Sequence, residues 1–263
     1  MAGNGKEPLR FRGFGVGSGE GRPAPLDALR PPEPARAIVA RAFELYGRYP
    51  LLFLVLALGV TAPYDLLVLI TTGSGPLAND NGLGLDFLLA TFLVSPLISA
   101  LHIHAVAEFQ AGRTPRLASI ALRGLRVLPT AAATAIMTTL GISIGLVLLI
   151  IPGILLAFRW YVAVQTAAIE RGGWLGAMRR SRELTRGIYG HLFGFAILIG
   201  VIGEIPLVIG RAAATGHDTR AVAFLGGVVL HSFALAFTAL ATALLYFDLA
   251  SRYRSTPATC GTV

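Results

Sequence analysis

The stretch from Val127 to Ile169 reads VLPTAAATAIMTTLGISIGLVLLIIPGILLAFRWYVAVQTAAI and contains a single charged side chain, Arg159. About 20 apolar residues are enough to cross the hydrocarbon core of a bilayer, so these forty-three residues are enough for two crossings. A turn between the two crossings is predicted at Pro152 and Gly153, because proline ends helices and glycine tolerates a reversal of the chain. The sequence therefore predicts an integral membrane protein with several spans.

The composition of the whole chain agrees with this interpretation. Hydrophobic residues make up 54% and charged residues 14% of the 263 residues, whereas soluble domains carry about 25% charged residues. The net charge is +8, and Lys6 is the only lysine. The arginines lie in short segments between apolar runs, a pattern that positive-inside topology and anionic lipid headgroups explain. We therefore expect membrane lipids with anionic headgroups as partners, and we do not expect nucleic acid.

Six membrane-spanning helices account for the apolar segments. The predicted spans are 51–71, 86–109, 129–150, 153–170, 190–210 and 221–249. Nineteen arginine and lysine residues fall in the segments on one side of the membrane, and two fall in the segments on the other side. The side rich in basic residues is cytoplasmic, so both termini are predicted to lie in the cytoplasm. Because abundant arginine with almost no lysine is typical of a GC-rich bacterial genome, we expect the bacterial plasma membrane.

Two tails are predicted on either side of a membrane domain of residues 34–254. Residues 1–33 alternate glycine with other residues and then contain several prolines, and we interpret them as a disordered cytoplasmic tail. A glycine-rich phosphate-binding loop would need a preceding strand and a following helix, and the pattern of this segment favours neither. Residues 255–263 are predicted to form a flexible C-terminal tail.

Three predicted cytoplasmic segments are amphipathic, each with an apolar stripe opposite a face of arginines. They are 34–49, 114–128 and 174–188. Basic amphipathic helices of this kind lie in the plane of the lipid headgroups. Each segment precedes two predicted spans. The predicted fold class is therefore an all-α integral membrane protein with six transmembrane helices as three hairpins, each preceded by a basic amphipathic interfacial helix.

Three ionisable residues, Asp65, Arg159 and Glu204, fall within the predicted spans. Burying such groups at membrane depth is unfavourable by several kcal/mol, so each is a candidate functional residue. The predicted topology puts all three in the outer half of the bilayer, and we expect them to form one polar cluster. The cluster is either a structural ion pair that holds the helices together or a site in which Arg159 binds an anionic group.

Other polar and small residues of the spans have simpler interpretations. His102 and His104 point about 160° apart on a helix, which is poor geometry for a metal site and favours a structural hydrogen bond. His231 stands alone in the sixth span, where interhelical hydrogen bonding is expected. Gly141 and Gly145 form one GxxxG pair, and Gly190 and Gly194 form another. Such pairs either pack helices within the protein or mark a homodimer interface, and packing within the protein is expected here. No metal or cofactor is predicted.

Catalytic motifs are not found in the sequence. It contains no His-Glu-x-x-His, Gly-x-Ser-x-Gly or paired-cysteine motif and no phosphate-binding P-loop. The predicted cytoplasmic segments are too short for a catalytic domain. We therefore do not expect this chain to be an enzyme.

Several short motifs resemble one known family when they are taken together. They are Arg41 to Leu45, Ile151-Pro152-Gly153-Ile154, Arg159-Trp160, Ala168-Ile169-Glu170, Arg180-Ser181 through Gly187, and Leu245 through Asp248 to Arg252. The combination resembles the membrane domain that precedes the catalytic barrel in some bacterial glycerophosphoryl diester phosphodiesterases, and the stand-alone six-span relatives of that domain. Over residues 35–254 the resemblance implies a six-helix membrane domain without an established activity. It implies no catalytic residue here, because the catalytic residues of those enzymes belong to the barrel.

Two functions are compatible with the sequence. The first is a non-catalytic membrane scaffold or accessory protein that contacts anionic lipid through its basic helices and binds a protein partner. The second is a transporter of a small solute or lipid that uses a polar site around Arg159. A scaffold predicts helices packed shut around a dry ion pair, whereas a transporter predicts a water-accessible cavity beside an unpaired carboxylate.

Overall fold

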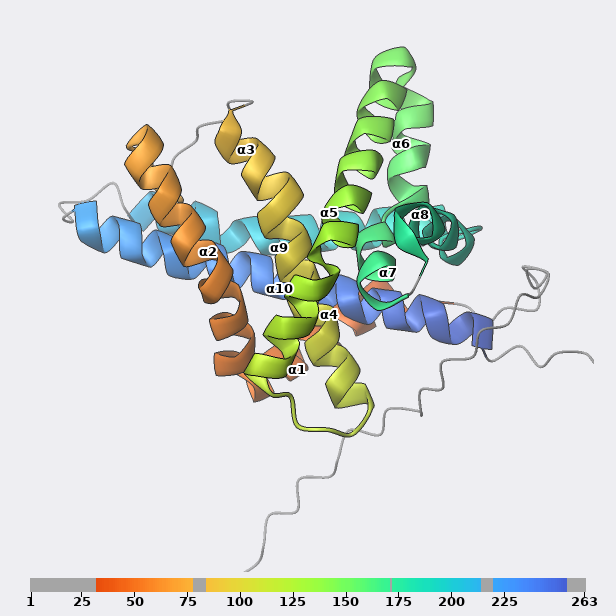
Figure 1. Ribbon diagram of the computed structural model, residues 1–263, viewed down its shortest axis with the longest axis horizontal. Helices are drawn as coiled ribbons and strands as arrows, with labels where there is room; N and C mark the ends of the chain where they lie inside the picture. Colours follow the sequence, from red (N-terminus) through yellow and green to blue (C-terminus); the bar gives the residue numbers. More distant parts are fainter. Residues whose placement is uncertain (1–31, 78–83, 171, 214–219, 255–263) are drawn as a thin grey trace, which may run out of the picture.

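The computed structural model of this chain consists of helices and their connections in the part that it describes (Figure 1). The described residues are 32–77, 84–170, 172–213 and 220–254. Among them, six helical segments are long and apolar enough to cross a membrane, namely Pro50–Thr72, Leu85–Gln110, Leu117–Leu148, Ile150–Ile169, Tyr189–Ala213 and Ala221–Arg252. The predicted class, an all-α multipass membrane protein, is confirmed. Except for Pro32 and Glu33, the predicted tails 1–33 and 255–263 lie outside the described residues.

The helices are arranged around the last span. They are α1 (Ala35–Arg48), α2 (Pro50–Thr72), α3 (Leu85–Leu89), the π-helical turn η2 (Ala90–Val94), α4 (Ser95–Gln110), α5 (Leu117–Leu148), α6 (Ile150–Arg159), α7 (Ala163–Ile169), α8 (Gly173–Leu184), α9 (Tyr189–Ala213) and α10 (Arg220–Arg254). The three expected hairpins form, since α2 packs against α4, α5 against α6, and α9 against α10. Figure 1 shows that α9 and α10 run across the direction of α2, α4 and α5. Because α10 also packs against α1, α2 and α4 and is the most deeply buried span, it is the central helix.

Two of the three predicted amphipathic segments form separate helices, α1 and α8. The apolar stripe of α1 is buried through Ile38, Val39, Ala42, Leu45 and Tyr46. The inward face of α8 consists of Ala177, Ser181 and Leu184. Pro50 begins α2 one residue after α1 ends, a position that suits proline because the first turn of a helix does not need its N–H. The break at this point turns α1 away from the first span.

The second amphipathic segment is not a separate helix, contrary to the prediction. Residues 117–128 are the first part of α5, which continues through Pro129 into the third span. The same face of the helix is buried before and after the proline, at Gly124 and at Ala131. Packing along this continuous face compensates for the one backbone hydrogen bond that a proline removes from a helix. The interfacial segment and the span are therefore one element.

The turn between the third and fourth spans lies three residues before the predicted position. It consists of Leu149 alone, which has an extended backbone with φ −158° and ψ 121°. Pro152 falls in the first turn of α6, where its missing N–H has no helical partner to lose. Gly153 faces α5 so closely that a Cβ there would lie 2.5 Å from the backbone nitrogen of Leu146. Close approach of two helices, rather than the reversal of the chain, explains this glycine.

The two glycine pairs behave differently. A Cβ on Gly141 would lie 2.6 Å from the ring of Trp160, and one on Gly145 would lie 2.9 Å from the Cα of Gly153. Packing within the protein is thus confirmed for this pair. Gly190 and Gly194 have no such neighbour, since a Cβ at either position would meet no atom within 4 Å. For that pair the prediction of a packing face was wrong.

The side chains at the tip of the α5–α6 hairpin are large, aliphatic and exposed. The exposed fraction is 87% for Val147 and 73% for Ile151. Such a surface suits contact with lipid hydrocarbon. The tip extends beyond the other helices in Figure 1.

Two clusters of buried apolar residues hold the helices together. The larger one joins α1, α2, α4, α9 and the second half of α10, with Phe53, Phe195 and Tyr246 among its most buried side chains. Burial in this cluster raises the pKa of Tyr46 to about 12, so its hydroxyl stays neutral. The smaller cluster contains Val94, Ile98 and Ala239, with Val60, Tyr64 and Leu235 packed against them. It lies between α2, the start of α4 and α10, next to the polar residues described below.

Candidate functional site

The polar cluster predicted from the sequence does not form. Among the described residues, no ion pair joins Arg159 to Asp65 or Glu204. The Nε of Arg159 instead donates to the hydroxyl of Tyr189 at 3.4 Å, at the start of α9. Glu204 lies about fifteen residues further along α9, which corresponds to roughly 22 Å, and its side chain is exposed. Formal charge suggested these partners, but the helix positions keep them apart.

The main chain of Arg159 is bound by side chains on and directly after α8. Its carbonyl oxygen accepts hydrogen bonds from Ser181 Oγ at 3.0 Å and from Thr185 Oγ1 at 3.2 Å. Ser181 lies on α8 and Thr185 follows its last residue; we call residues 173–186 the α8 segment. The outward face of this segment carries exposed arginines. The fourth span breaks after Arg159, and these hydroxyls accommodate the break because they bind a carbonyl that the helix no longer uses. Arg159 therefore lies beside the amphipathic helix α8.

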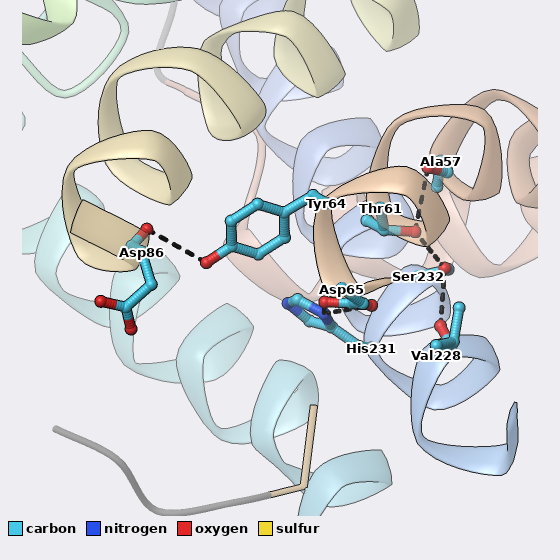
Figure 2. Close-up of polar contacts among 8 residues, drawn as sticks. All are labelled: Ala57, Thr61, Tyr64, Asp65, Asp86, Val228, His231 and Ser232. Atoms are coloured by element: carbon cyan, nitrogen blue, oxygen red, sulfur yellow. Dashed lines mark hydrogen bonds and ion pairs between the residues drawn. The ribbon is translucent and has the colours of Figure 1, made fainter. Parts of the chain in front are cut away.

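Asp65 is paired with His231 on α10 (Figure 2). The Asp65 side chain is 3% exposed, and its two oxygens lie 3.1 and 3.2 Å from Nδ1 of His231. An ionised carboxylate only accepts hydrogen bonds, so Nδ1 of His231 carries the hydrogen. The interhelical hydrogen bond predicted for His231 is confirmed. The sequence did not predict that its partner is Asp65. The pairing could have been suspected from the sequence, because Asp65 and His231 each need a polar partner within the membrane.

A second polar contact joins the same two helices next to this pair. Thr61 Oγ1 and Ser232 Oγ lie 2.5 Å apart, and both residues are fully buried. Each hydroxyl also contacts a carbonyl of its own helix, Ala57 O for Thr61 and Val228 O for Ser232, as Figure 2 shows. The contact fixes the register of α2 against α10 and so holds Asp65 opposite His231.

The Asp65–His231 pair lines an open pocket of about 480 Å³. The rest of its wall comes from the ends of α2 and α3 and the segments next to them, including Tyr64, Thr72 and Asp86. The hydroxyl of Tyr64 donates to the backbone oxygen of Asp86 at 3.1 Å and closes one side (Figure 2). The described lining contains two carboxylates and no lysine or arginine. The described lining is therefore acidic by formal charge.

Three residues of the family-like motif, Glu170, Arg180 and Asp248, lie elsewhere, around the second half of α10. Tyr246 Oη donates to Glu170 Oε1 at 2.9 Å, and Arg180 Nε lies 3.5 Å from the same oxygen. At the other edge Asp248 Oδ2 accepts from the backbone N–H of Glu33 at 3.2 Å. These contacts tie α7, α8 and the segment before α1 to the central helix. Gly187 has a φ of 79° in the turn between α8 and α9, a conformation that favours glycine.

The polar residues at the end of the second span have structural roles. His102 is fully buried, and its Nδ1 lies 2.8 Å from the carbonyl of Ile98, which confirms the structural hydrogen bond. Glu108 pairs with Arg113 at 2.6 Å and also with Arg123 on α5. In the part of the chain that the structure describes, no group of three histidine, cysteine or acidic side chains is placed to hold a metal ion.

The fold and the pocket define an all-α multipass membrane protein with an acidic pocket beside its central helix. Comparison of the chain with protein-family models, with curated proteins and with solved structures finds no match.

Proposed function

We propose that this protein is a membrane carrier that binds a small amine-bearing solute in the pocket beside Asp65 and His231. The observation that carries the proposal is a carboxylate, buried in a membrane span and bound by a histidine, at the wall of an open pocket. Ionisable residues inside membranes are typical of solute pathways and proton relays. A volume of about 480 Å³ is in the range of small-molecule sites. Of the two functions considered from the sequence, this is the transporter, with its site moved away from Arg159.

The chemistry of the lining favours a cationic solute. Asp65 can serve as the counter-ion of an ammonium group, and Asp86 adds a second negative charge to the wall. The ring of Tyr64 can contact such a cation through its face.

The test is equilibrium binding of organic ammonium ions to the purified protein in lipid nanodiscs. Tetramethylammonium and methylammonium serve as probes, and their affinities are measured for the native protein and for Asp65→Asn. Loss of a charge-assisted contact is worth about 1.5–3 kcal/mol, so we expect affinity to fall about tenfold or more. The asparagine keeps the shape of the side chain and can still contact His231, which limits the effect on folding.

Glu204→Gln is the matched control, because it removes the same charge from a span at an exposed position outside the pocket. It is expected to bind the probes like the native protein. Equal affinity of native protein and Asp65→Asn, or no binding of either probe by the native protein, would contradict the proposal.

A second candidate function is that of a scaffold that holds anionic lipid at its basic helices. It is supported by the outward face of the α8 segment, where Arg179, Arg182 and Arg186 are exposed opposite the buried stripe. Replacing all three by glutamine is expected to reduce the phosphatidylglycerol retained by the protein in native mass spectrometry from mixed nanodiscs. Retention of phosphatidylcholine should stay the same and serves as the control. Unchanged retention of phosphatidylglycerol would rule out this role for α8.

A further inference from the structure

A second pocket lies further along the central helix from the first one. Its volume is about 310 Å³, and its wall is formed by η2, α4, α5, α7, α10 and the turn before α7. His231 belongs to the first pocket, whereas Thr238 and Thr242 belong to the second. Seven residues separate His231 from Thr238, a distance of about 10 Å along a helix. The two pockets are therefore close neighbours on α10.

The lining of the second pocket combines hydroxyl-bearing residues with apolar ones such as Ile98, Val164 and Leu235. Hydroxyl groups come from four elements, for example from Thr91, Ser99, Thr138 and Thr242, and no charged side chain is among the lining residues. Gln165 on α7 is only 5% exposed, and its amide oxygen has no hydrogen-bond partner among the described residues. A buried acceptor without a partner is unfavourable. The oxygen itself is buried, so the hydroxyl groups are the polar groups that line the pocket.

A thin apolar layer separates the two pockets. It is the smaller cluster described above, with Val94, Ile98 and Ala239 at its centre. Tyr64 of this cluster lines the first pocket, while Ile98 and Ala239 line the second. The pockets therefore lie on opposite sides of the same few side chains.

The π-helical turn η2 is next to this layer. Val94, its last residue, belongs to the layer, and Thr91 lines the second pocket. π-helical turns are rare and are frequent at functional sites. Conversion of this turn to a regular α-helix would rotate Val94 relative to Ile98 and so change the layer between the pockets.

On both the second span and α10, the residues that line the first pocket come earlier in the sequence than those that line the second. Along the second span the first pocket uses Asp86 and the second uses Thr91 and Ser99. Along α10 the order is His231 and then Thr242. On each helix this order goes from the predicted outer end toward the predicted cytoplasmic end. The pockets therefore follow each other across the predicted membrane.

We propose that the two pockets are the two halves of one pathway for the amine-bearing solute, and that the apolar layer around Ile98 is its gate. This inference rests on the proposed carrier function. In the second pocket the solute donates its N–H groups to hydroxyl oxygens of the lining. Because no carboxylate is present there, the solute is held more weakly than beside Asp65. A weaker second site favours release.

The test measures the reaction of engineered cysteines with MTSET, a membrane-impermeant quaternary ammonium reagent. The native Cys260 is first replaced by serine. Ser99→Cys and Thr139→Cys place a thiol in the second pocket from two different helices, and Thr72→Cys places one in the first. Leu140→Cys is the lipid-facing control, because this side chain is 52% exposed and lines neither pocket.

In sealed vesicles we expect both second-pocket cysteines to react at least tenfold faster than Leu140→Cys, and from the side opposite to Thr72→Cys. Adding Ile98→Ala removes the centre of the layer and is expected to let Ser99→Cys react from both sides. Reaction of Ser99→Cys and Thr139→Cys at the rate of Leu140→Cys would overturn the inference. Unchanged sidedness with Ile98→Ala would also overturn it.

The labelling experiment needs no bound solute, so its result is separate from that of the binding experiment. If Asp65→Asn binds the ammonium probes normally while the Ile98→Ala gate effect is seen, the proposed solute site fails and the pathway stands. If Asp65→Asn loses binding while the second pocket stays unreactive, the solute site stands and the pathway fails.

Discussion

Replacing Gly153 by alanine is expected to open the α5–α6 hairpin and to destabilise the protein by about 3 kcal/mol. The new Cβ would lie 2.5 Å from the nitrogen and 2.7 Å from the Cα of Leu146. These are backbone atoms of α5 and cannot rotate out of the way, so the helices have to separate. Helix association in membranes depends on close packing of small residues, and the contact between Gly145 and Gly153 would be lost with the separation.

Thermal unfolding in mild detergent measures the global effect of this substitution, and tryptophan emission reports on the hairpin itself. The Trp160 ring packs over Gly141 in the native hairpin, so its emission should shift when the helices part. Gly194→Ala is the matched control, because its Cβ would meet no atom within 4 Å. A Gly153→Ala protein as stable as the Gly194→Ala protein would show that the hairpin does not pack this closely.

Replacing Phe53 by alanine is expected to destabilise the protein by about 3 kcal/mol. The ring is fully buried, with its centroid 6.0 Å from that of Tyr46 and 5.7 Å from that of His102. Truncation of a buried phenylalanine typically destabilises a protein by about 3–5 kcal/mol. We expect the lower end of this range, because the unfolded chain in a membrane still keeps the ring in hydrocarbon. The loss then comes mainly from the cavity and its missing dispersion contacts.

Leu51→Ala is the control for Phe53→Ala, since this side chain lies on the same helix and is 75% exposed. Solvent or lipid fills the space that it leaves, so we expect a loss below about 1 kcal/mol. Reversible unfolding in mixed micelles compares the two variants. Losses of similar size at the two positions would contradict the assignment of Phe53 to the core.

The candidate site could be predicted in part. The sequence pointed to Asp65 because an ionisable residue stood in an apolar span, and the structure places Asp65 at the pocket. It favoured Arg159 as the partner because opposite formal charges attract. The partner is His231, which was counted as neutral. Which polar residues meet depends on how α2 crosses α10, and the residues Thr61 and Ser232 that set this register belong to ordinary polar types.

Helix boundaries also depend on contacts between helices and could be predicted only in part. The stretch around Arg159 is apolar enough for one continuous span, yet the helix stops there because Ser181 and Thr185 bind the released carbonyl. Pro129, by contrast, looked like a boundary and lies within α5. At Arg159 side chains from another helix outweighed the local preference of the chain for a continuous helix. At Pro129 a face that is buried along the whole of α5 outweighed the local preference for a helix end.

The sequence by itself determined the class of this protein. Six apolar segments of sufficient length are local properties of the chain, because the bilayer requires about 20 apolar residues in each helical span. Only the tertiary structure decided which polar groups face one another and where the pockets lie. Three contacts illustrate this, because each joins residues from different helices. They are the pairing of Asp65 with His231, the contact between Gly145 and Gly153, and the apolar layer around Ile98. Their positions depend on crossing geometry and register, which no single segment encodes.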